Sequence, residues 1–267
     1  MRLKRRVSLE GVHLDSLDSR ILITGVEESA GKDNVNGISY GFGDGQRVTG
    51  QRRDTLDVTV KFTLAVKPGD MTERSDVLEK ICAWAVNGGI LKTSARGSDR
   101  RLRVLCAQLP AGGDKYKYDS EYTIVFRAFT VPYWQNDKAL EVSPKKEGAN
   151  RTVSMDVPGT VPTPAAITIT NVSGAKINTI TVTAGSSVMT FTGLGLAADE
   201  KLVIDHVNSG KEFYLRIRKG GSTMVSAMAY RSTDSANDLW CGPGHVSFNV
   251  NAQRAVTYTV SVRGRFA

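Results

Sequence analysis

Three histidines are the residues of this chain best suited to metal binding or acid–base catalysis, and they lie far apart in the sequence. His13, His206 and His245 lack the short, fixed spacing that presents two imidazoles to one metal, and no HExxH motif occurs. A Ser-His-Asp triad assembles in space, so linear spacing does not exclude one. The GxSxG turn that would signal its nucleophile does not occur. We interpret the histidines as ordinary surface or turn residues and assign no catalytic or metal-binding residue.

Acidic and glycine-rich segments suggest other chemistry only weakly. Asp199-Glu200 and Asp205 could act as a glycosidase pair, but nothing distinguishes them from acids in solvated loops. The stretch Gly41–Gly45 precedes a predicted strand, whereas a dinucleotide-binding loop must precede a helix. Gly31-Lys32 is followed by Asp33 in place of the Ser or Thr of a P-loop. The sequence therefore predicts no cofactor and no enzymatic activity.

The three cysteines fit neither a zinc site nor a disulfide framework. Cys82, Cys106 and Cys241 are an odd number and are widely spaced. We expect them to be buried small apolar side chains in a reducing compartment.

The densest basic stretch after the N-terminus contains Arg96, Arg100, Arg101 and Arg103. Clustered arginines can follow a phosphate backbone, but this segment has no interleaved aromatic rings on which bases would stack. Arg101 and Arg103 should share one face of a strand. We favour an interface or a solvated surface over a nucleic-acid site.

The composition is that of a globular protein with room for two domains. The chain has 267 residues and 28.9 kDa, of which 40% are hydrophobic and 23% charged. Its net charge of +8 is spread, since residues 1–157 hold 25 basic and 21 acidic side chains and residues 158–267 hold 10 and 6. No apolar stretch reaches the roughly 18 residues that span a bilayer. Glu10 and Asp15 interrupt what would be the apolar part of a signal peptide, so we expect no standard export.

The first half predicts an antiparallel sheet with one helix. Apolar and polar residues alternate over residues 56–66, as in a half-buried strand, and residues 20–26 could form its neighbour. Asp70 and Glu73 have the offset of a capping box, and a helical pattern continues to Gly88-Gly89. Strands over residues 102–109 and 120–131 complete an α+β domain, which we assign to residues 1–140.

The second half predicts an all-β domain. Prolines and polar residues interrupt the apolar pattern over residues 141–164, which we interpret as a linker. Short strands at a spacing of roughly 8–12 residues indicate a β-sandwich over residues 165–267. The expected strands are residues 166–172, 177–183, 188–192, 202–207, 212–218, 245–250 and 256–263.

Several segments, taken in order, match one known family. The long strand over residues 55–66, the helix over residues 72–87 and the closing segment Phe129–Trp134 resemble the N-terminal domain of the distal tail protein (Dit) family of long-tailed bacteriophages. The late loop over residues 238–245 and the ending Arg263–Phe266 are similar to the galectin-like or carbohydrate-module-like sandwich of that family. The family's Pro-Gly-x-Asn is Pro243-Gly244-His245-Val246 here, so we carry over the turn and not the role of that asparagine.

The resemblance implies a structural virion protein and not an enzyme. Dit proteins form a homohexameric ring at the tail tip, closed around the channel by the N-terminal belt domain, and DNA meets the ring only by passing through it. The ring joins the tail tube to the tail-associated hub or fibre protein. The sandwich domains project outward, where they carry receptor-binding proteins or, in decorated members, bind sugars. We accordingly expect a tail-tip protein of the virion that is made in the host cytoplasm and does not insert into a membrane.

A ring also needs a contact between neighbouring subunits. The strand over residues 55–66 is our candidate, because an unpaired edge strand tends to pair with another chain.

Three other functions remain as alternatives. A carbohydrate-binding adhesin would use the rings of Trp240, Tyr214 and Tyr230, although we favour packing inside the sandwich for Trp240. A tail-tube-type structural protein would not normally carry a second domain of this size. A nucleic-acid-binding protein would rely on the net charge of +8.

Overall fold

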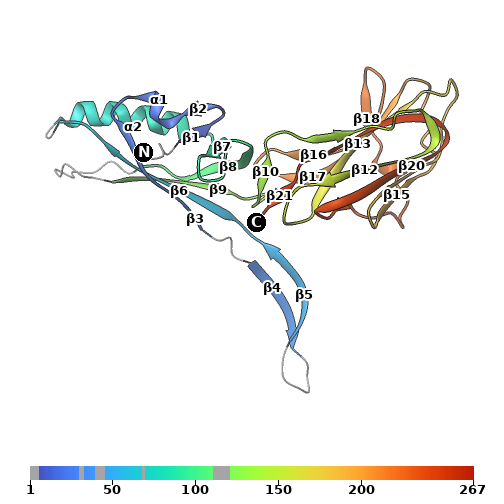
Figure 1. Cartoon of the computed structure of the whole chain (residues 1–267), viewed down its shortest axis with the longest axis horizontal. Coiled ribbons are helices and arrows are strands. Elements are labelled where there is room, and N and C mark those ends of the chain that lie inside the picture. The colour runs from blue at the N-terminus through green and yellow to red at the C-terminus, as the bar shows by residue number, and fades with distance from the viewer. Residues whose placement is uncertain (1–5, 30–32, 40–45, 68–69, 111–120) are drawn as a thin grey trace. The chain divides into compact units, whose positions relative to one another are not determined.

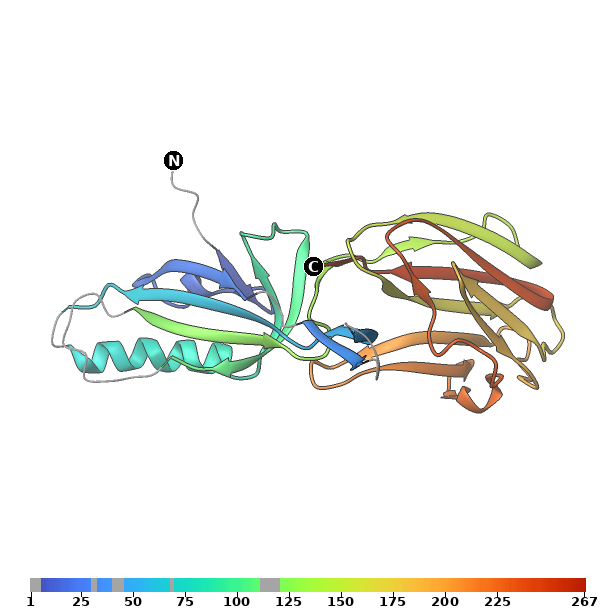
Figure 2. The ribbon, with the colours of Figure 1, turned by 90° about the horizontal axis from the view of Figure 1, so that it is seen from below.

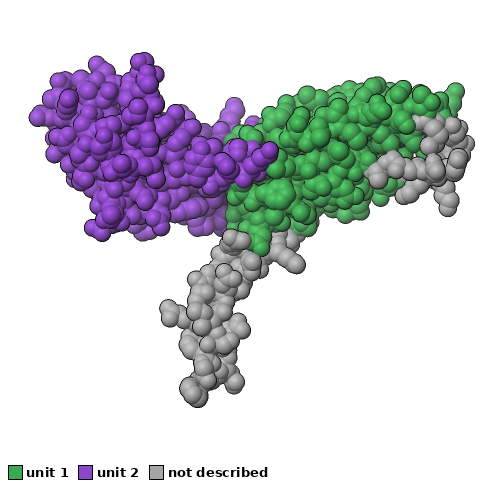
Figure 3. Space-filling view, turned by 180° about the vertical axis from the view of Figure 1, so that it is seen from behind, with its two compact units in different colours: residues 1–134 green, residues 135–267 purple. Residues whose placement is uncertain are grey.

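The structure of the chain is a computed structural model that describes residues 6–29, 33–39, 46–67, 70–110 and 121–267, with backbone alone at residues 33–39, 46–52 and 71. It divides into two compact units, unit 1 (residues 1–134) and unit 2 (residues 135–267) (Figures 1 and 3). Strands predominate in the described residues, and both α-helices belong to unit 1. Neither of these helices has the length and apolar character that crossing a bilayer requires.

Unit 1 contains an antiparallel sheet with the strand order β2-β1-β7-β8-β9-β6-β3. A separate hairpin is formed by β4 and β5, which pair with each other. The elements are β1 (Val7–Leu9), β2 (Val12–His13), α1 (Leu14–Leu17), β3 (Ile21–Glu28), β4 (Asp33–Ser39), β5 (Gln46–Arg53), β6 (Leu56–Leu64), α2 (Met71–Ala85), β7 (Gly89–Thr93), β8 (Arg100–Gln108) and β9 (Tyr122–Ala128).

The predicted long strand and helix are both confirmed. Every second residue of β6 is buried, as the alternation of its sequence requires. The Asp70 carboxylate accepts a hydrogen bond from the backbone N–H of Glu73 at 2.9 Å and so caps α2. Val77 and Ile81 are fully buried, and α2 runs along one face of the sheet of unit 1 (Figure 2).

The expectation that β6 pairs between subunits is wrong. β6 is bonded to β3 on one side and to β9 on the other, so its backbone groups are already satisfied within the chain. The alternating pattern shows that a strand has one buried face, but it does not show how many neighbours the strand has. The two ends of the strand order given above are β2 and β3.

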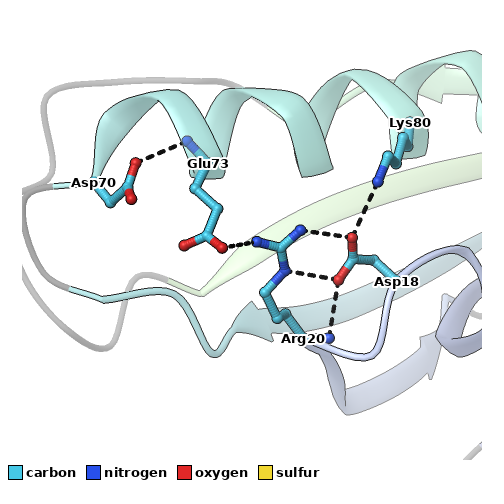
Figure 4. Close-up of polar contacts among 5 residues, drawn as sticks. All are labelled: Asp18, Arg20, Asp70, Glu73 and Lys80. Atoms are coloured by element: carbon cyan, nitrogen blue, oxygen red, sulfur yellow. Dashed lines mark hydrogen bonds and ion pairs between the residues drawn. The ribbon is translucent and has the colours of Figure 1, made fainter.

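Asp18 is the centre of an ion-pair network that ties the start of β3 to α2 (Figure 4). Arg20 donates to both carboxylate oxygens of Asp18, at 2.7 and 2.8 Å, and Lys80 lies 3.2 Å from the same carboxylate. Arg20 also bonds Glu73, in the first turn of α2. The Asp18 side chain is only 9% exposed. Hydrogen bonds from the side chain and backbone of Arg20 hold the pKa of Asp18 well below its usual range.

This network predicts a pH-dependent stability. The pKa of Asp18 is lower in the folded than in the unfolded chain, so its contribution is complete above the ordinary value of about 3.9 and is lost as the pH falls through the folded value. We expect Asp18→Asn to reduce the free energy of unfolding near pH 7, and the difference from the unaltered chain to shrink below about pH 4. Urea unfolding of both proteins, at pH values from 7 to below 4, measures this difference in the free energy of unfolding. Asp76→Asn, an exposed change on α2, is the control. A deficit for Asp18→Asn that does not vary with pH would contradict the explanation.

Unit 2 contains an antiparallel sheet with the order β15-β14-β20-β13-β16-β17-β18, to which β11, β12 and β19 are added. The prediction of an all-β second half is confirmed, apart from one short 3₁₀ turn. From residue 134 onward the elements are β10 (Trp134–Asn136), β11 (Leu140–Val142), β12 (Gly148–Val157), β13 (Thr163–Asn171), β14 (Ile180–Ala184), β15 (Ser187–Phe191), β16 (Lys201–Asn208), β17 (Phe213–Gly220), β18 (Met224–Ser226), η1 (Met228–Tyr230), β19 (Trp240–Cys241), β20 (Gly244–Val262) and β21 (Arg265–Phe266).

The long strand β20 closes this sheet around its core. Residues 244–252 pair with β12 and β14, and residues 256–262 pair with β13 and β11. Phe248 and Tyr258 fill the core from the two parts of the strand. We expected two strands, residues 245–250 and 256–263, and this expectation is wrong. Gln253, Arg254 and Ala255 interrupt the alternation only at exposed Arg254, and the same phase of burial continues on both sides without a break in the strand.

The interpretation of residues 141–164 as a linker is also wrong. β12 pairs with β20 over most of its length, and β13 begins at Thr163. Val153 and Met155 pack against the core, and Val157 is buried. The prolines that suggested a linker lie between β12 and β13 or at the start of β13. Unit 1 accordingly ends at Trp134, and a ring-forming role for it stays a prediction.

Candidate functional site

The structure does not bring the candidate catalytic residues together. His206 binds the Asp238 carboxylate through Nε2, at 2.8 and 2.9 Å, whereas Nδ1 of His245 lies 3.1 Å from exposed Asp156. His13 is exposed in β2. Within the described ranges, no group of three or more His, Cys, Asp or Glu side chains could hold a metal ion.

The candidate acids have structural roles. Asp205 is a half-buried residue of β16, so its interpretation as a loop acid is wrong. Arg216 donates to both of its oxygens, at 2.8 and 2.6 Å. Burial alone would raise the pKa of Asp205, but the hydrogen bonds and charges of Arg216 and Arg218 outweigh it and lower that pKa. Glu200 accepts a hydrogen bond from the backbone of Ala197 at 2.8 Å, which holds a turn.

The three cysteines are free thiols of low reactivity. Cys241 is buried and donates from Sγ to the Thr163 carbonyl at 3.1 Å. Burial raises its pKa to about 11, and it also raises the pKa values of half-buried Cys82 and Cys106. A raised pKa keeps the thiol protonated and therefore weakly nucleophilic at neutral pH. The glycine stretch Gly41–Gly45 and the pair Gly31-Lys32 lie outside the described residues.

The arginine cluster separates into different environments. Arg101 and Arg103 share one face of β8, as predicted, because Leu102 and Val104 are buried on the other. Arg96 is instead tied to Glu28 by three hydrogen bonds of 2.6–3.1 Å. The four side chains therefore do not form one continuous track.

The closing segment of unit 1 is a buried anchor. Trp134 is fully buried, and its indole N–H donates to Glu28 at 3.2 Å. The Arg96 guanidinium lies 6.0 Å from the Trp134 ring centroid, so Glu28 joins both residues. The guanidinium of Arg53 lies 5.2 Å from the centroid of Tyr133. The Pro-Tyr-Trp segment that follows β9 is thus held against Glu28 at the end of β3 and against Arg96 in the loop after β7.

Trp240 is not inside the core of unit 2, which corrects our preferred interpretation. The residue is 40% exposed, whereas Leu239 and Cys241 on either side are buried. Successive side chains of a strand point to opposite faces, so burying these two neighbours turns Trp240 outward.

A stack of side chains lies beneath the Trp240 ring. The Arg265 guanidinium is 5.4 Å from the Trp240 centroid and 5.2 Å from that of Phe213. Phe213 stacks in turn on His206 at 5.3 Å and 8°. Of the other two candidate rings, Tyr214 is 49% exposed, and Tyr230 has the Lys219 ammonium 4.0 Å from its centroid.

No model of a known protein family matches this sequence, and no curated protein does. Among solved structures, the chain is similar to the Dit protein of phage SPP1, described as a paradigm of the hub adsorption apparatus in phages that infect Gram-positive bacteria. The two share 14% identity and a TM-score of 0.65, over 98% of this chain and 99% of that one. The fold is that of a Dit protein.

Two chains of the phage P2 baseplate, in its activated conformation with Ca and with Sr, also align at 8% identity. They cover 98% and 96% of this chain and 98% and 97% of their own, with TM-scores of 0.49 and 0.47. These scores are too low to support an assignment.

The last segment that carried the resemblance has structural contacts in this chain. In the ending Arg263–Phe266, Arg263 donates to the Asn136 carbonyl at 3.2 Å and Gly264 accepts from the Asn136 N–H at 3.1 Å. The Arg265 carbonyl accepts from Thr160 at 2.8 Å. The end of the chain is thereby tied to the start of unit 2.

Sequence reasoning missed the partners of these segments. Glu28 lies more than 100 residues before Trp134, and Phe213 lies 52 residues before Arg265. The ending with its two arginines entered the sequence analysis only through the family resemblance, which did not indicate the contacts of these side chains.

Proposed function

We propose that this chain is a structural, non-enzymatic subunit of the tail tip of a long-tailed phage. It forms a homohexameric ring through unit 1, links the tail tube to the tail-associated hub or fibre protein, and carries receptor-binding components on unit 2. The observation that carries the proposal is the similarity of fold to SPP1 Dit over 98% of this chain. The structural roles of Asp205, Glu200 and His206 agree with a protein that has no catalytic task.

The sheet of unit 1 offers two surfaces for the ring contact. A ring needs a heterologous interface, in which two different surfaces of the subunit meet. The edge strands β2 and β3 differ in sequence, and each carries an exposed apolar side chain, Val12 at 47% and Leu22 at 53%. We propose that β3 of one subunit meets β2 of the next, so that the edges are covered.

Native mass spectrometry of the full chain, alone and with its hub partner, tests the ring. We expect a species of six times 28.9 kDa. A monomer under every condition, including with that partner, would refute the proposed function.

Substitution at the edges tests the contact separately. Leu22→Lys and Val12→Lys should each shift the assembly to smaller species, because each places an ammonium in the covered contact. Val225→Lys is the matched control, since Val225 is also 53% exposed but lies in unit 2. If both edge variants still form the ring, the ring stands and the edge contact is wrong.

A further inference from the structure

The sheet of unit 2 is protected differently at its two ends. Its strand order begins at β15 and ends at β18. Along β15, the chain covers the edge with its own residues 231–236. The backbone N–H of Ser232 donates to the Thr190 carbonyl at 2.8 Å. That of Ala236 donates to the Val188 carbonyl at the same distance. An edge covered in this way has no free backbone groups to offer to another chain.

The opposite edge is covered along only part of β17. Strand β18 pairs with β17 at residues 218–220. The N–H of Ala227 then donates to the Ile217 carbonyl at 2.9 Å, after which the chain turns away into η1. Within the described residues, no strand pairs with residues 213–216 on this side of β17. The sheet therefore has an open stretch of edge there.

Backbone groups of Phe213 and Leu215 point out of this open stretch. In an antiparallel pair, successive residues of a strand direct their N–H and C=O groups alternately to the two sides. The Ile217 carbonyl is directed toward Ala227, so the odd-numbered residues of β17 face away from β16. Among the described residues, no hydrogen bond reaches the Leu215 backbone on that side. These donors and acceptors match the backbone of one further strand.

We propose that an extended segment of another tail-tip protein adds a strand to β17 at residues 213–216. Strand addition is a common way to bind a peptide, because the exposed edge supplies a row of main-chain hydrogen bonds. Natural edges are often blocked by a proline or a bulge. This stretch contains no proline, and β17 pairs with β16 in regular register over all eight residues. The inference rests on the proposed function, since it names the surface of unit 2 that carries a partner.

The two faces of β17 define the side chains that such a segment needs. On the inner face, half-buried Leu215 packs at the margin of the core beside buried Ile217, so an apolar neighbour would extend the core. On the outer face, Arg216 and Arg218 both bond the single carboxylate of Asp205. This group of three has an excess of one positive charge, which an acidic neighbour would balance. The occupant is therefore an extended segment in which apolar and acidic residues alternate.

Binding of a synthetic peptide to the full chain tests the proposal. The probe is a capped, fluorescent octapeptide in which valine alternates with aspartate and threonine, and anisotropy measures its binding. We expect it to bind at least about tenfold more tightly than a peptide of the same composition in scrambled order, which corresponds to about 1.4 kcal/mol. A peptide with lysine in place of aspartate should also bind more weakly.

Leu215→Pro is the variant that addresses the backbone. Proline removes the outward N–H, and an edge strand tolerates it where that N–H faces solvent. We expect this variant to lose peptide binding. Leu215→Ala is the matched control, because it removes the same side chain and keeps the N–H, and it should retain binding. Circular dichroism checks that both variants fold. Arg216→Gln leaves the backbone unaltered and should reduce the preference for aspartate over lysine, which keeps the proposal testable if Leu215→Pro does not fold.

Three results would overturn the proposal. They are absence of binding by the alternating peptide, equal binding of the scrambled peptide, and binding that Leu215→Pro leaves unchanged. Self-association of the full chain that Leu215→Pro abolishes would also overturn it, because the occupant would then be a second copy. Native mass spectrometry separates this inference from the proposed function. A ring of six subunits without peptide binding refutes the inference alone, whereas peptide binding by a chain that never forms the ring refutes the proposed function and supports strand addition.

Discussion

Replacing Trp134 with alanine will lower the free energy of unfolding of unit 1 by about 3 to 5 kcal/mol. The side chain is fully buried and is among the largest in the core, so its removal leaves a cavity that the surrounding sheet cannot fill. It also removes the donor to Glu28 and the ring beside Arg96. Trp134→Phe should cost less, because it keeps part of the ring and loses mainly the hydrogen bond.

Urea unfolding of the full chain measures this loss, with hydrogen exchange assigning it to residues 6–134. Phe129→Ala provides the control, since Phe129 belongs to the same closing segment and is 45% exposed. We expect it to change stability by less than about 1 kcal/mol. Equal effects of the two alanine substitutions would show that Trp134 is not an anchor.

Asn171→Asp changes few atoms, and we expect it to lower the stability of unit 2 more than any other substitution of that size. Asn171 is fully buried at the end of β13, and its Nδ2 donates to the carbonyls of Ala175, Leu196 and Ala197 at 2.8–3.0 Å. Its Oδ1 accepts two hydrogen bonds from Ser173. Three carbonyls around one nitrogen require a donor there, which fixes the orientation of the amide.

An aspartate of the same shape would place a carboxylate oxygen against these carbonyls. The result is a buried charge without a compensating cation, and we expect a loss of about 3 to 5 kcal/mol in unit 2. Thermal unfolding near pH 7 measures it, with Asn178→Asp at an exposed position as the control. A loss no greater than that of the control would show that the amide does not hold the loops together. Partial recovery at low pH, where the carboxyl is neutral, would support the explanation.

The proposed function rests on the similarity of fold to a Dit protein, and the two edge strands supply the proposed contact between subunits. The described sheet of unit 1 ends at β2 and β3, which must be covered, charged or paired in any stable assembly. A ring covers both edges with one repeated contact.

The sequence by itself determined the elements whose signal is local. The alternation in β6 and the Asp70 cap of α2 are read directly from spacing, because burial of one face imposes a period on the chain. The order of weak motifs also predicted the Dit fold, which the structure confirms. Local signals failed where polar residues or prolines interrupted the pattern, as in β12 and in the middle of β20.

Only the tertiary structure decided which groups meet. It placed β6 inside the sheet, turned Trp240 outward above Arg265, and joined Glu28 to Trp134. Periodicity reports whether a residue faces the core, and it carries no information on which distant strand or side chain completes the contact. The partners of an edge and the base of a stack come from segments far apart in the chain, so packing of the whole unit was needed to define them.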